Sequence, residues 1–195
     1  MRIVSKEARL FLRKFMGSPK EIGSVIPSSR HLTGSMVRAV PWHNVRKVAE
    51  LGAGTGVITE AIARNVSPDA RVYVFEKDSG MRRKLRMDYP DFVHAANAVH
   101  LDRVLGSDGQ SQGQLDCILS GLPFYNFPQA FRDSLLEQIV NGLKPGGLFV
   151  AFQYSLQMKK QLSKHFVIER IKLVPLNFPP AFVYICRKGN ERDGK

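Results

Sequence analysis

The stretch ELGAGTG (50–56) sets three glycines behind a carboxylate, where a predicted strand (46–52) turns into a predicted helix (56–66). Glycines at 52, 54 and 56 allow a tight turn and let a ligand lie directly against the main chain. A dinucleotide-binding turn reads G-x-G-x-x-G, but residue 57 is valine, so the spacing disfavours a pyrophosphate. The carboxylate of Glu50 would also repel phosphate, whereas it suits a ligand that carries an ammonium group.

Glu76 ends the next predicted strand (70–78), 20 residues after Gly56. A carboxylate at this position can accept hydrogen bonds from both ribose hydroxyls. A nucleoside that carries an amino group and needs no phosphate clamp is S-adenosylmethionine. The ordered set of Glu50, the loop from Gly52 through Ala53 and Gly54 to Gly56, and Glu76 therefore predicts a binding site for this cofactor.

Predicted strands and helices alternate from residue 45 onward, which indicates an α/β fold with a parallel sheet and helices on both faces. In such sheets ligands bind at the carboxyl ends of the strands. The later predicted elements are a helix at 79–90, strands at 92–96 and 115–121, a helix at 128–143, a strand at 147–155, a helix at 159–166 and two closing strands at 167–176 and 181–188.

The fourth predicted strand ends in an unusual corner, SGLPFYNFP (120–128). It follows a central strand, so we expect it beside the reacting methyl group. Methyl transfer is an in-line displacement in which the protein mainly positions the nucleophile and excludes water. Pro123 would fix a bend whose neighbouring carbonyls face an amine, and Phe124 and Tyr125 would offer ring faces to a cationic or flat substrate. The alternative is a proline-stiffened loop that packs on the core.

Residues 46–155 resemble the class I S-adenosylmethionine-dependent methyltransferase domain. The resemblance implies a Rossmann-like, seven-stranded mixed sheet of order 3-2-1-4-5-7-6 with its last strand antiparallel. It implies that Glu76 holds the ribose, that the 52–56 loop faces the methionine part and that Ser120 also lies at the cofactor. Asn97 stands where the family usually has an aspartate on the adenine amino group; its amide oxygen could accept the same hydrogen bond.

Two families within this superfamily share the corner, the ribosomal RNA adenine dimethylases and the bacterial phospholipid N-methyltransferases. The ribosomal RNA adenine dimethylases carry Asn-Leu-Pro-Tyr, in which the Asn orients an aromatic amino group. Here that position is Gly121, which has no side-chain acceptor. An unmet polar group in a closed site costs about 1–3 kcal/mol, so the missing acceptor argues against adenine N6 as the methylated group. Methylation of an RNA base is therefore the less favoured alternative.

The chain also resembles the bacterial phospholipid N-methyltransferases over nearly its whole length, through Pro-Ser-Ser-Arg (27–30), Ser-Gly-Leu-Pro (120–123), Lys-Pro-Gly-Gly (144–147) and Asn-Phe-Pro-Pro-Ala (177–181). The resemblance implies transfer of one or more methyl groups to the amine of phosphatidylethanolamine. The expected substrate-binding residues are Ser28, Ser29, Arg30, Gly121, Leu122 and Tyr125. Arg30 would pair with the lipid phosphate. Tyr125 or water would take the amine proton, with His31 as a less favoured alternative.

The net charge of +12 indicates a polyanionic partner, either a membrane surface or nucleic acid. Residues 2–16 can be drawn as a helix with an apolar stripe opposite four basic residues, Arg2, Lys6, Arg9 and Arg13. This pattern is typical of a helix lying in an anionic membrane interface, although a helix capping the domain would show it too. We therefore expect an N-terminal helix and substrate-entrance segment (1–44), a methyltransferase domain (45–195), and attachment to the inner face of the cytoplasmic membrane.

Two cysteines, Cys117 and Cys186, sit inside apolar runs and are expected to be buried thiols without a disulfide partner or a metal. No run approaches the 18 apolar residues of a membrane span. A protein that only binds S-adenosylmethionine or membranes is a further alternative, which the intact cofactor motif disfavours.

Overall fold

A computed structural model describes residues 29–107 and 114–189 of the chain. These residues form one seven-stranded sheet of order β3-β2-β1-β4-β5-β7-β6, which confirms the predicted topology. The first five strands run parallel, and β7 is antiparallel to both of its neighbours. The strands are β1 (Lys47–Leu51), β2 (Arg71–Phe75), β3 (Val93–Ala95), β4 (Leu115–Ser120), β5 (Leu143–Gln153), β6 (Val167–Val174) and β7 (Ala181–Arg187).

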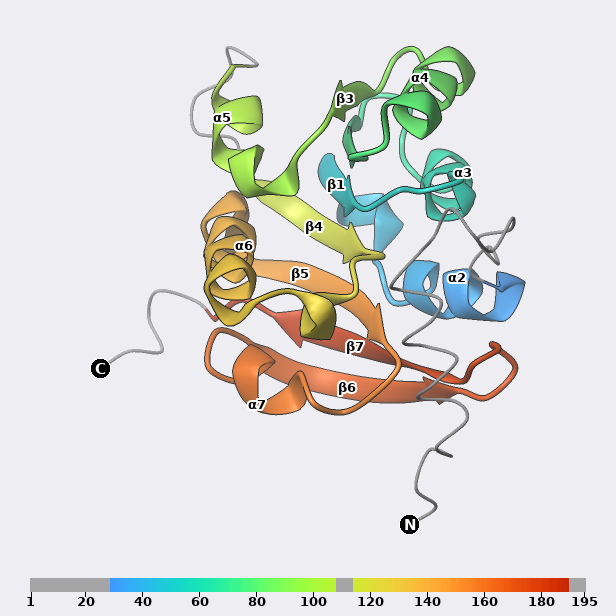
Figure 1. Cartoon of the computed structure of the whole chain (residues 1–195). Helices are drawn as coiled ribbons and strands as arrows, with labels where there is room; N and C mark the ends of the chain where they lie inside the picture. Colours follow the sequence, from blue (N-terminus) through green and yellow to red (C-terminus); the bar gives the residue numbers. More distant parts are fainter. Residues whose placement is uncertain (1–28, 108–113, 190–195) are drawn as a thin grey trace.

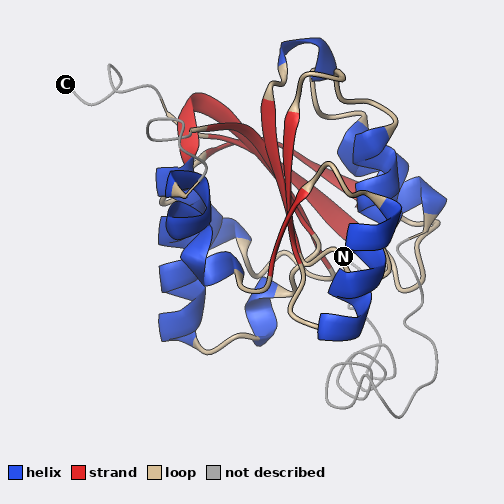
Figure 2. Ribbon diagram, turned by 90° about the horizontal axis from the view of Figure 1, so that it is seen from above, coloured by secondary structure: helices blue, strands red, loops and turns tan. Residues whose placement is uncertain are grey.

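Helices cover both faces of the sheet, with α2, α3 and α4 on one face and α5, α6 and α7 on the other (Figures 1 and 2). Two hydrophobic clusters separate in the same way, one beneath each layer of helices. The helices are α2 (Arg30–Val37), α3 (Val57–Ala63), α4 (Ser79–Asp88), α5 (Leu101–Gly106), α6 (Gln129–Gly142) and α7 (Lys159–Leu162).

The alternation of side chains along β1 decides which face receives the carboxylate of Glu50. Val48 packs in the cluster beneath α2 and α3, whereas Ala49 and Leu51 pack in the opposite cluster. Because successive side chains of a strand point to opposite faces, Glu50 points the same way as Val48, toward α3. The strand therefore aims a charged group into the interior directly before the glycine loop.

Several elements differ from the predicted ones at their boundaries. α3 ends at Ala63 instead of residue 66. β5 begins at Leu143, which pairs with Leu115 of β4. The Lys-Pro-Gly-Gly segment that follows is bonded to the residue after β7: Gly146 N donates to Lys188 O and Lys188 N donates to Gly147 O. The short helices α2 and α5 were not predicted. Ser29 precedes α2, and its hydroxyl accepts a hydrogen bond from Leu32 N and so caps the helix.

The division at residues 44 and 45 stays a prediction, but the described end of the N-terminal segment packs on the sheet. Leu32, Met36 and Val37 of α2 are buried in the cluster that also contains Val48 of β1 and Val183 of β7. α2 is thus part of the same core as the sheet. The predicted amphipathic helix at 2–16, with Arg2, Lys6, Arg9 and Arg13, and the predicted substrate residue Ser28 lie outside the described residues.

Cys117 in β4 and Cys186 in β7 are buried free thiols, in the strands where they were expected. Burial raises the pKa of both, and that of Cys186 to about 12, so neither is ionised at neutral pH. Within residues 29–107 and 114–189, no helix is both long and apolar enough to cross a membrane.

Candidate active site

The glycine loop between β1 and α3 is held against the end of β2. Gly52 N and Ala53 N both donate to Phe75 O, at 2.8 and 3.1 Å. Gly52, Gly54 and Gly56 all have positive φ, at 77°, 56° and 88°, which only glycine adopts without strain. A Cβ at Gly54 would meet no atom within 4 Å, so the main chain there faces open space. This is the surface on which a ligand can lie against bare backbone.

Glu76 directly follows β2 and is half-buried. Its Oε2 accepts a hydrogen bond from Gly54 N at 2.6 Å, and its Oε1 accepts one from Asp78 N at 2.8 Å. Each carboxylate oxygen has two acceptor sites, so each keeps one for a ligand hydroxyl. Glu76 therefore fixes the glycine loop and can still bind a pair of ribose hydroxyls.

Glu50 lies fully buried at the end of β1. Its Oε2 accepts a hydrogen bond from Thr59 Oγ1 at 2.6 Å, while its Oε1 is buried without a partner among the described residues. Burial raises the pKa of Glu50 to about 8, and the nearby charge of Glu76 acts in the same direction. A positive charge on a bound ligand would favour the ionised form and lower this pKa.

Asn97 follows β3 and lies exposed beside the same edge of the sheet. Its Oδ1 accepts a hydrogen bond from Val99 N at 3.2 Å and so caps the short 3₁₀ helix at Ala98–His100. An amide oxygen has a second acceptor site, which leaves room for a hydrogen bond from an adenine amino group. That contact stays a prediction.

The corner after β4 touches the glycine loop through main chain. Gly121 N donates to Leu51 O at 2.9 Å, and a Cβ at residue 121 would approach Gly52 O to 2.9 Å. Real Cβ atoms do not approach a backbone oxygen this closely without displacement, so a larger residue here would have to shift the main chain of the glycine loop or of the corner. The structure thus gives a packing reason for the missing asparagine of the adenine dimethylase pattern.

Pro123 was expected to fix a bend whose neighbouring carbonyls face a substrate amine, and the carbonyl before it is already hydrogen-bonded within the protein. Leu122 O accepts hydrogen bonds from Gln153 Nε2 at 2.9 Å and from Phe124 N at 3.0 Å. Both of its lone pairs are therefore used within the protein. Ser120 is buried beneath it, and its hydroxyl accepts a hydrogen bond from Leu122 N at 3.2 Å. The corner is a rigid support.

Phe124 was expected to offer its ring to the substrate, and the structure corrects this. Its side chain is buried and packs edge-to-face against Phe127 and Phe149, with ring centroids 6.5 and 6.0 Å apart. Sequence alone does not tell which of two adjacent aromatic residues points inward. Here the 3₁₀ turn at Phe124–Asn126 sends Phe124 into the core and leaves Tyr125 exposed.

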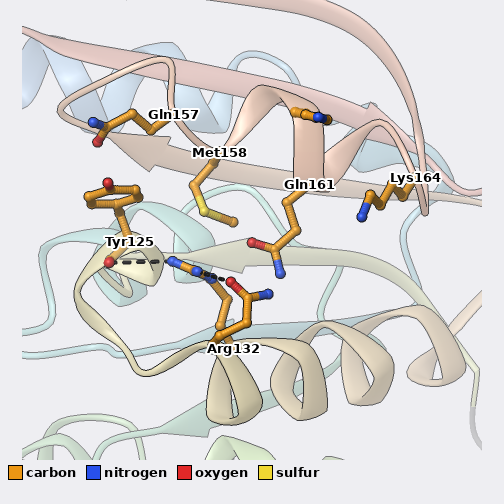
Figure 3. A pocket seen from close by; sticks show the side chains of 8 residues that line it. Tyr125, Arg132, Gln157, Met158, Gln161 and Lys164 are labelled. Atoms are coloured by element: carbon orange, nitrogen blue, oxygen red, sulfur yellow. Dashed lines mark hydrogen bonds between the residues drawn. The ribbon is translucent and has the colours of Figure 1, made fainter.

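Tyr125 lines a pocket of about 230 Å³ between the start of α6 and α7 (Figure 3). The guanidinium of Arg132 lies 5.7 Å from the centre of its ring and also donates to Tyr125 O at 3.4 Å. Figure 3 shows the two residues facing Met158 and Gln161 across the pocket. None of the predicted cofactor-binding residues lines this pocket, so a catalytic role for Tyr125 stays a prediction.

The two motifs most specific to the phospholipid enzymes meet in space. Ser29 N, from the Pro-Ser-Ser-Arg segment, donates to Oδ1 of Asn177 at 3.1 Å, although 148 residues separate them. Asn177 is buried, its Nδ2 donates to Pro179 O at 2.7 Å, and its side chain hydrogen-bonds the hydroxyl of Tyr154. Burial raises the pKa of Tyr154, against the effect of that hydrogen bond.

This junction identifies residues that sequence reasoning did not name as site residues. Phe152 and Tyr154, at the end of β5, pack edge-to-face at 5.6 Å, and Phe152 lies 3.8 Å from where a Cβ at Gly121 would stand. Gln153 donates a hydrogen bond to Leu122 O in the corner. The next residue, Tyr154, contacts Asn177, which is bonded to Ser29 at the start of α2. The available signal was the run FQY (152–154), in which aromatic and polar side chains close an otherwise apolar strand.

These residues fit S-adenosylmethionine. The open main chain at Gly54, the free acceptor sites of Glu76 and the buried, unpaired carboxyl oxygen of Glu50 are the features that a ligand with ribose hydroxyls and an ammonium group requires. Together with the sheet order, they define a class I S-adenosylmethionine-dependent methyltransferase.

Comparison with known proteins agrees with this class. The sequence profile of the methyltransferase domain family matches residues 48–147, and the chain belongs to this family. A curated relative from Singulisphaera acidiphila, an ornithine lipid N-methyltransferase, is 37% identical over 191 residues, which cover 93% of this chain and 96% of the relative.

Solved structures share the fold at much lower identity. The N-methyltransferase NodS of Bradyrhizobium japonicum, in complex with S-adenosylhomocysteine, is 12% identical with a TM-score of 0.69 over 89% of this chain and 97% of that one. The 1,6-didemethyltoxoflavin-N1-methyltransferase of Burkholderia thailandensis, with bound S-adenosylhomocysteine, is 15% identical with a TM-score of 0.70 over 97% and 93%. The cofactor of this protein is S-adenosylmethionine.

Proposed function

We propose that this protein transfers methyl groups from S-adenosylmethionine to the amine of a membrane lipid head group. The observation that carries the proposal is the 37% identity, over nearly the full length of both chains, to an enzyme that methylates a lipid nitrogen. The identity extends beyond the cofactor-binding half, so it includes the segments that would recognise the acceptor.

The junction of Ser29, Asn177 and Tyr154 supports a dedicated acceptor site. It ties the start of α2 to the loop after β6 and to the end of β5, beside Gly121. We assign the entrance for the lipid to this region, with Arg30, exposed on the first turn of α2, as the partner for an anionic group of the head group. Phe152 and Tyr154 would line the path toward the corner.

Glu76 would hold the ribose, the main chain at Gly54 would lie against the methionine part, and Asn97 would meet the adenine. Glu50 is fully buried beneath the glycine loop. From there its carboxylate would stabilise the ammonium group. When bound, the cofactor supplies an electrophilic methyl group on a sulfonium. The protein's part is to orient the amine, exclude water and let the amine lose its proton before attack.

The corner does not favour an aromatic amino group as the acceptor. Gly121 offers no side-chain acceptor, a larger residue would meet Gly52 O, and both lone pairs of Leu122 O are used. An adenine N6 would therefore lack the orienting acceptors that the dimethylases provide. An aliphatic amine on a lipid needs no such planar pair of hydrogen bonds.

We further propose that the protein acts at an anionic membrane surface on the cytoplasmic side, with Arg2, Lys6, Arg9 and Arg13 at the level of the head groups. The excess of basic residues supports this: residues 1–50 contain ten Lys and Arg against three Asp and Glu. Each basic residue near an anionic leaflet contributes about 1 kcal/mol of binding.

Phosphatidylethanolamine and an ornithine lipid are the two candidate acceptors. The phospholipid motifs in the sequence favour the former, and the name of the curated relative favours the latter. The test incubates purified protein and labelled S-adenosylmethionine with vesicles of each lipid in the same anionic background, and identifies products by mass spectrometry. Methylated product from either lipid supports the proposed function and names the acceptor. Absence of product from both contradicts it.

A further inference from the structure

The loop between β6 and β7 exposes an unusual amount of apolar surface. Leu176 and Phe178 in the loop are 68% and 75% exposed, and Leu173, near the end of β6, is 51% exposed. Single exposed apolar residues are ordinary on protein surfaces, whereas three within six positions, at the end of a strand and in the loop that follows it, form a patch of the kind that contacts partners or membranes.

The exposure does not come from a loosely attached loop. Asn177, between Leu176 and Phe178, is buried and bonded to Ser29 N and Pro179 O, and its own N donates to Val174 O at 3.3 Å. The anchored residue points inward, and the two apolar residues on either side of it are left on the surface. The fold thus fixes the backbone and presents Leu176 and Phe178 outward.

The loop lies beside elements that carry exposed cationic side chains, which indicates an anionic partner. It is bonded to Ser29, where residues 1–28 with their basic side chains join the described structure. Exposed cationic residues lie on the elements that meet here: Arg30 on α2, and Arg170 and Lys172 on β6. Exposed apolar side chains on a surface whose neighbouring elements carry exposed cations suit the boundary between anionic head groups and acyl chains.

We propose that Leu176 and Phe178 insert into the interface of an anionic lipid bilayer, with Arg30 and Lys172 at head-group level. This inference rests on the proposed function, because a lipid acceptor has to pass from the membrane to the entrance beside Asn177. The inserted loop places that entrance directly on the membrane, so the head group reaches the corner while the acyl chains stay in lipid.

The insertion can be measured with a fluorophore whose emission depends on polarity, attached to the full-length Leu176→Cys variant. Cys117 and Cys186 are fully buried, so labelling is directed to the new thiol. The matched control is Met87→Cys, at a residue 69% exposed on α4. Vesicles contain equal parts phosphatidylethanolamine and phosphatidylglycerol. We expect a blue shift and brighter emission at residue 176 with vesicles, and little change at residue 87.

Three outcomes would overturn the inference. Emission at residue 176 that stays unchanged while the protein sediments with vesicles means that another surface makes the contact. Emission already blue-shifted without vesicles means that residues 1–28 cover the loop. A vesicle-free blue shift that grows with protein concentration means that a second copy covers it.

A double variant, Leu176→Gln with Phe178→Gln, separates this inference from the proposed function. We expect its vesicle affinity to fall about tenfold or more, because two large apolar side chains no longer enter the lipid, while cofactor affinity is unchanged. The matched control replaces Met87 by Gln. If lipid is methylated but the double variant binds vesicles normally, the inference fails alone. If the loop inserts but no lipid is methylated, the proposed function fails alone.

Discussion

Glu50 couples the stability of the cofactor-free protein to pH. Its pKa is about 8 in the folded protein, against 4.5 for the exposed side chain. Between these values the unfolded chain releases a proton that the folded protein keeps, so the contribution of Glu50 to stability falls as pH rises from about 4.5 to about 8. Each unit of pKa shift corresponds to about 1.4 kcal/mol.

Glu50→Gln should therefore gain stability relative to the native protein as pH rises through this window, and should weaken cofactor binding. Thermal unfolding of both proteins without cofactor at pH 5 and pH 8 measures the first effect. Glu60→Gln, on the exposed side of α3, is the control and should show neither. A difference between native protein and Glu50→Gln that does not change with pH would contradict the assignment.

Glu76→Gln tests the predicted ribose contact while keeping the shape of the side chain. One oxygen remains to accept the hydrogen bond from Gly54 N, but the negative charge that strengthens bonds to hydroxyls is lost. We expect cofactor affinity to fall about tenfold to a hundredfold, since a hydrogen bond to a charged group contributes about 1.5–3 kcal/mol. Calorimetric titration with S-adenosylhomocysteine gives the value; native affinity in the variant would exclude the contact.

Gly121→Ala should destabilise the protein and lower activity, because the new methyl group would stand 2.9 Å from Gly52 O in the cofactor loop. Overpacking of this kind costs about 1–3 kcal/mol. Gly106→Ala, at the end of α5, meets no atom within 4 Å and should be neutral or slightly stabilising. Equal melting temperatures for the two variants would contradict the close approach seen at the corner.

At the scale of elements, the sequence was informative where structure depends on neighbouring residues. The turn from β1 to α3 was predicted because three glycines and an acid in seven residues encode it locally. The strand order came from the family resemblance, which the described sheet confirms. The roles inside the corner could not be predicted, because the 3₁₀ turn and the bond from Gln153 decide which groups face inward.

The acceptor side was the least predictable because it depends on contacts between distant segments. The bond from Ser29 to Asn177 joins residues 148 positions apart, and nothing local in either motif indicates the other. α2 was missed because it has only eight residues, and its buried Leu32, Met36 and Val37 signal a helix only weakly. The match of both motifs to one enzyme family was the only hint that they act together.

Asn177→Ala tests whether this junction serves the acceptor. It removes the bond to Ser29 N, leaves a partly buried donor without its partner and should destabilise the protein by about 1–3 kcal/mol. We expect lipid methylation to fall further than this loss of stability explains, with cofactor affinity unchanged. Asn65→Ala, at an exposed residue whose side chain donates to Ala61 O, is the control. A parallel loss of cofactor affinity would mean that the junction supports the whole fold instead.

At the scale of the whole molecule, the charge of +12 should govern where the protein works. Replacing Arg2, Lys6, Arg9 and Arg13 by Gln should weaken binding to anionic vesicles by roughly a hundredfold to a thousandfold, given about 1 kcal/mol for each residue. Cofactor binding should survive. Sedimentation with vesicles of rising phosphatidylglycerol content measures the loss.

The matched control for this variant replaces four basic residues elsewhere by Gln: Arg64, at the end of α3, and Arg83, Lys84 and Arg86 in α4. It carries the same net charge and should keep most of the vesicle affinity. Equal losses in the two variants would mean that only total charge matters, and unchanged binding of the N-terminal variant would exclude the interfacial helix.

The central claim is that the acceptor is a lipid amine, and one competition measures it most directly. Full-length protein and labelled S-adenosylmethionine are mixed with small-subunit ribosomal RNA and with vesicles that contain both candidate amine lipids and phosphatidylglycerol. The label is then counted in the lipid and RNA fractions. We predict label in the lipid fraction, increasing with the phosphatidylglycerol content. Label in the RNA fraction alone would contradict the account and would assign the basic surface to a phosphate backbone.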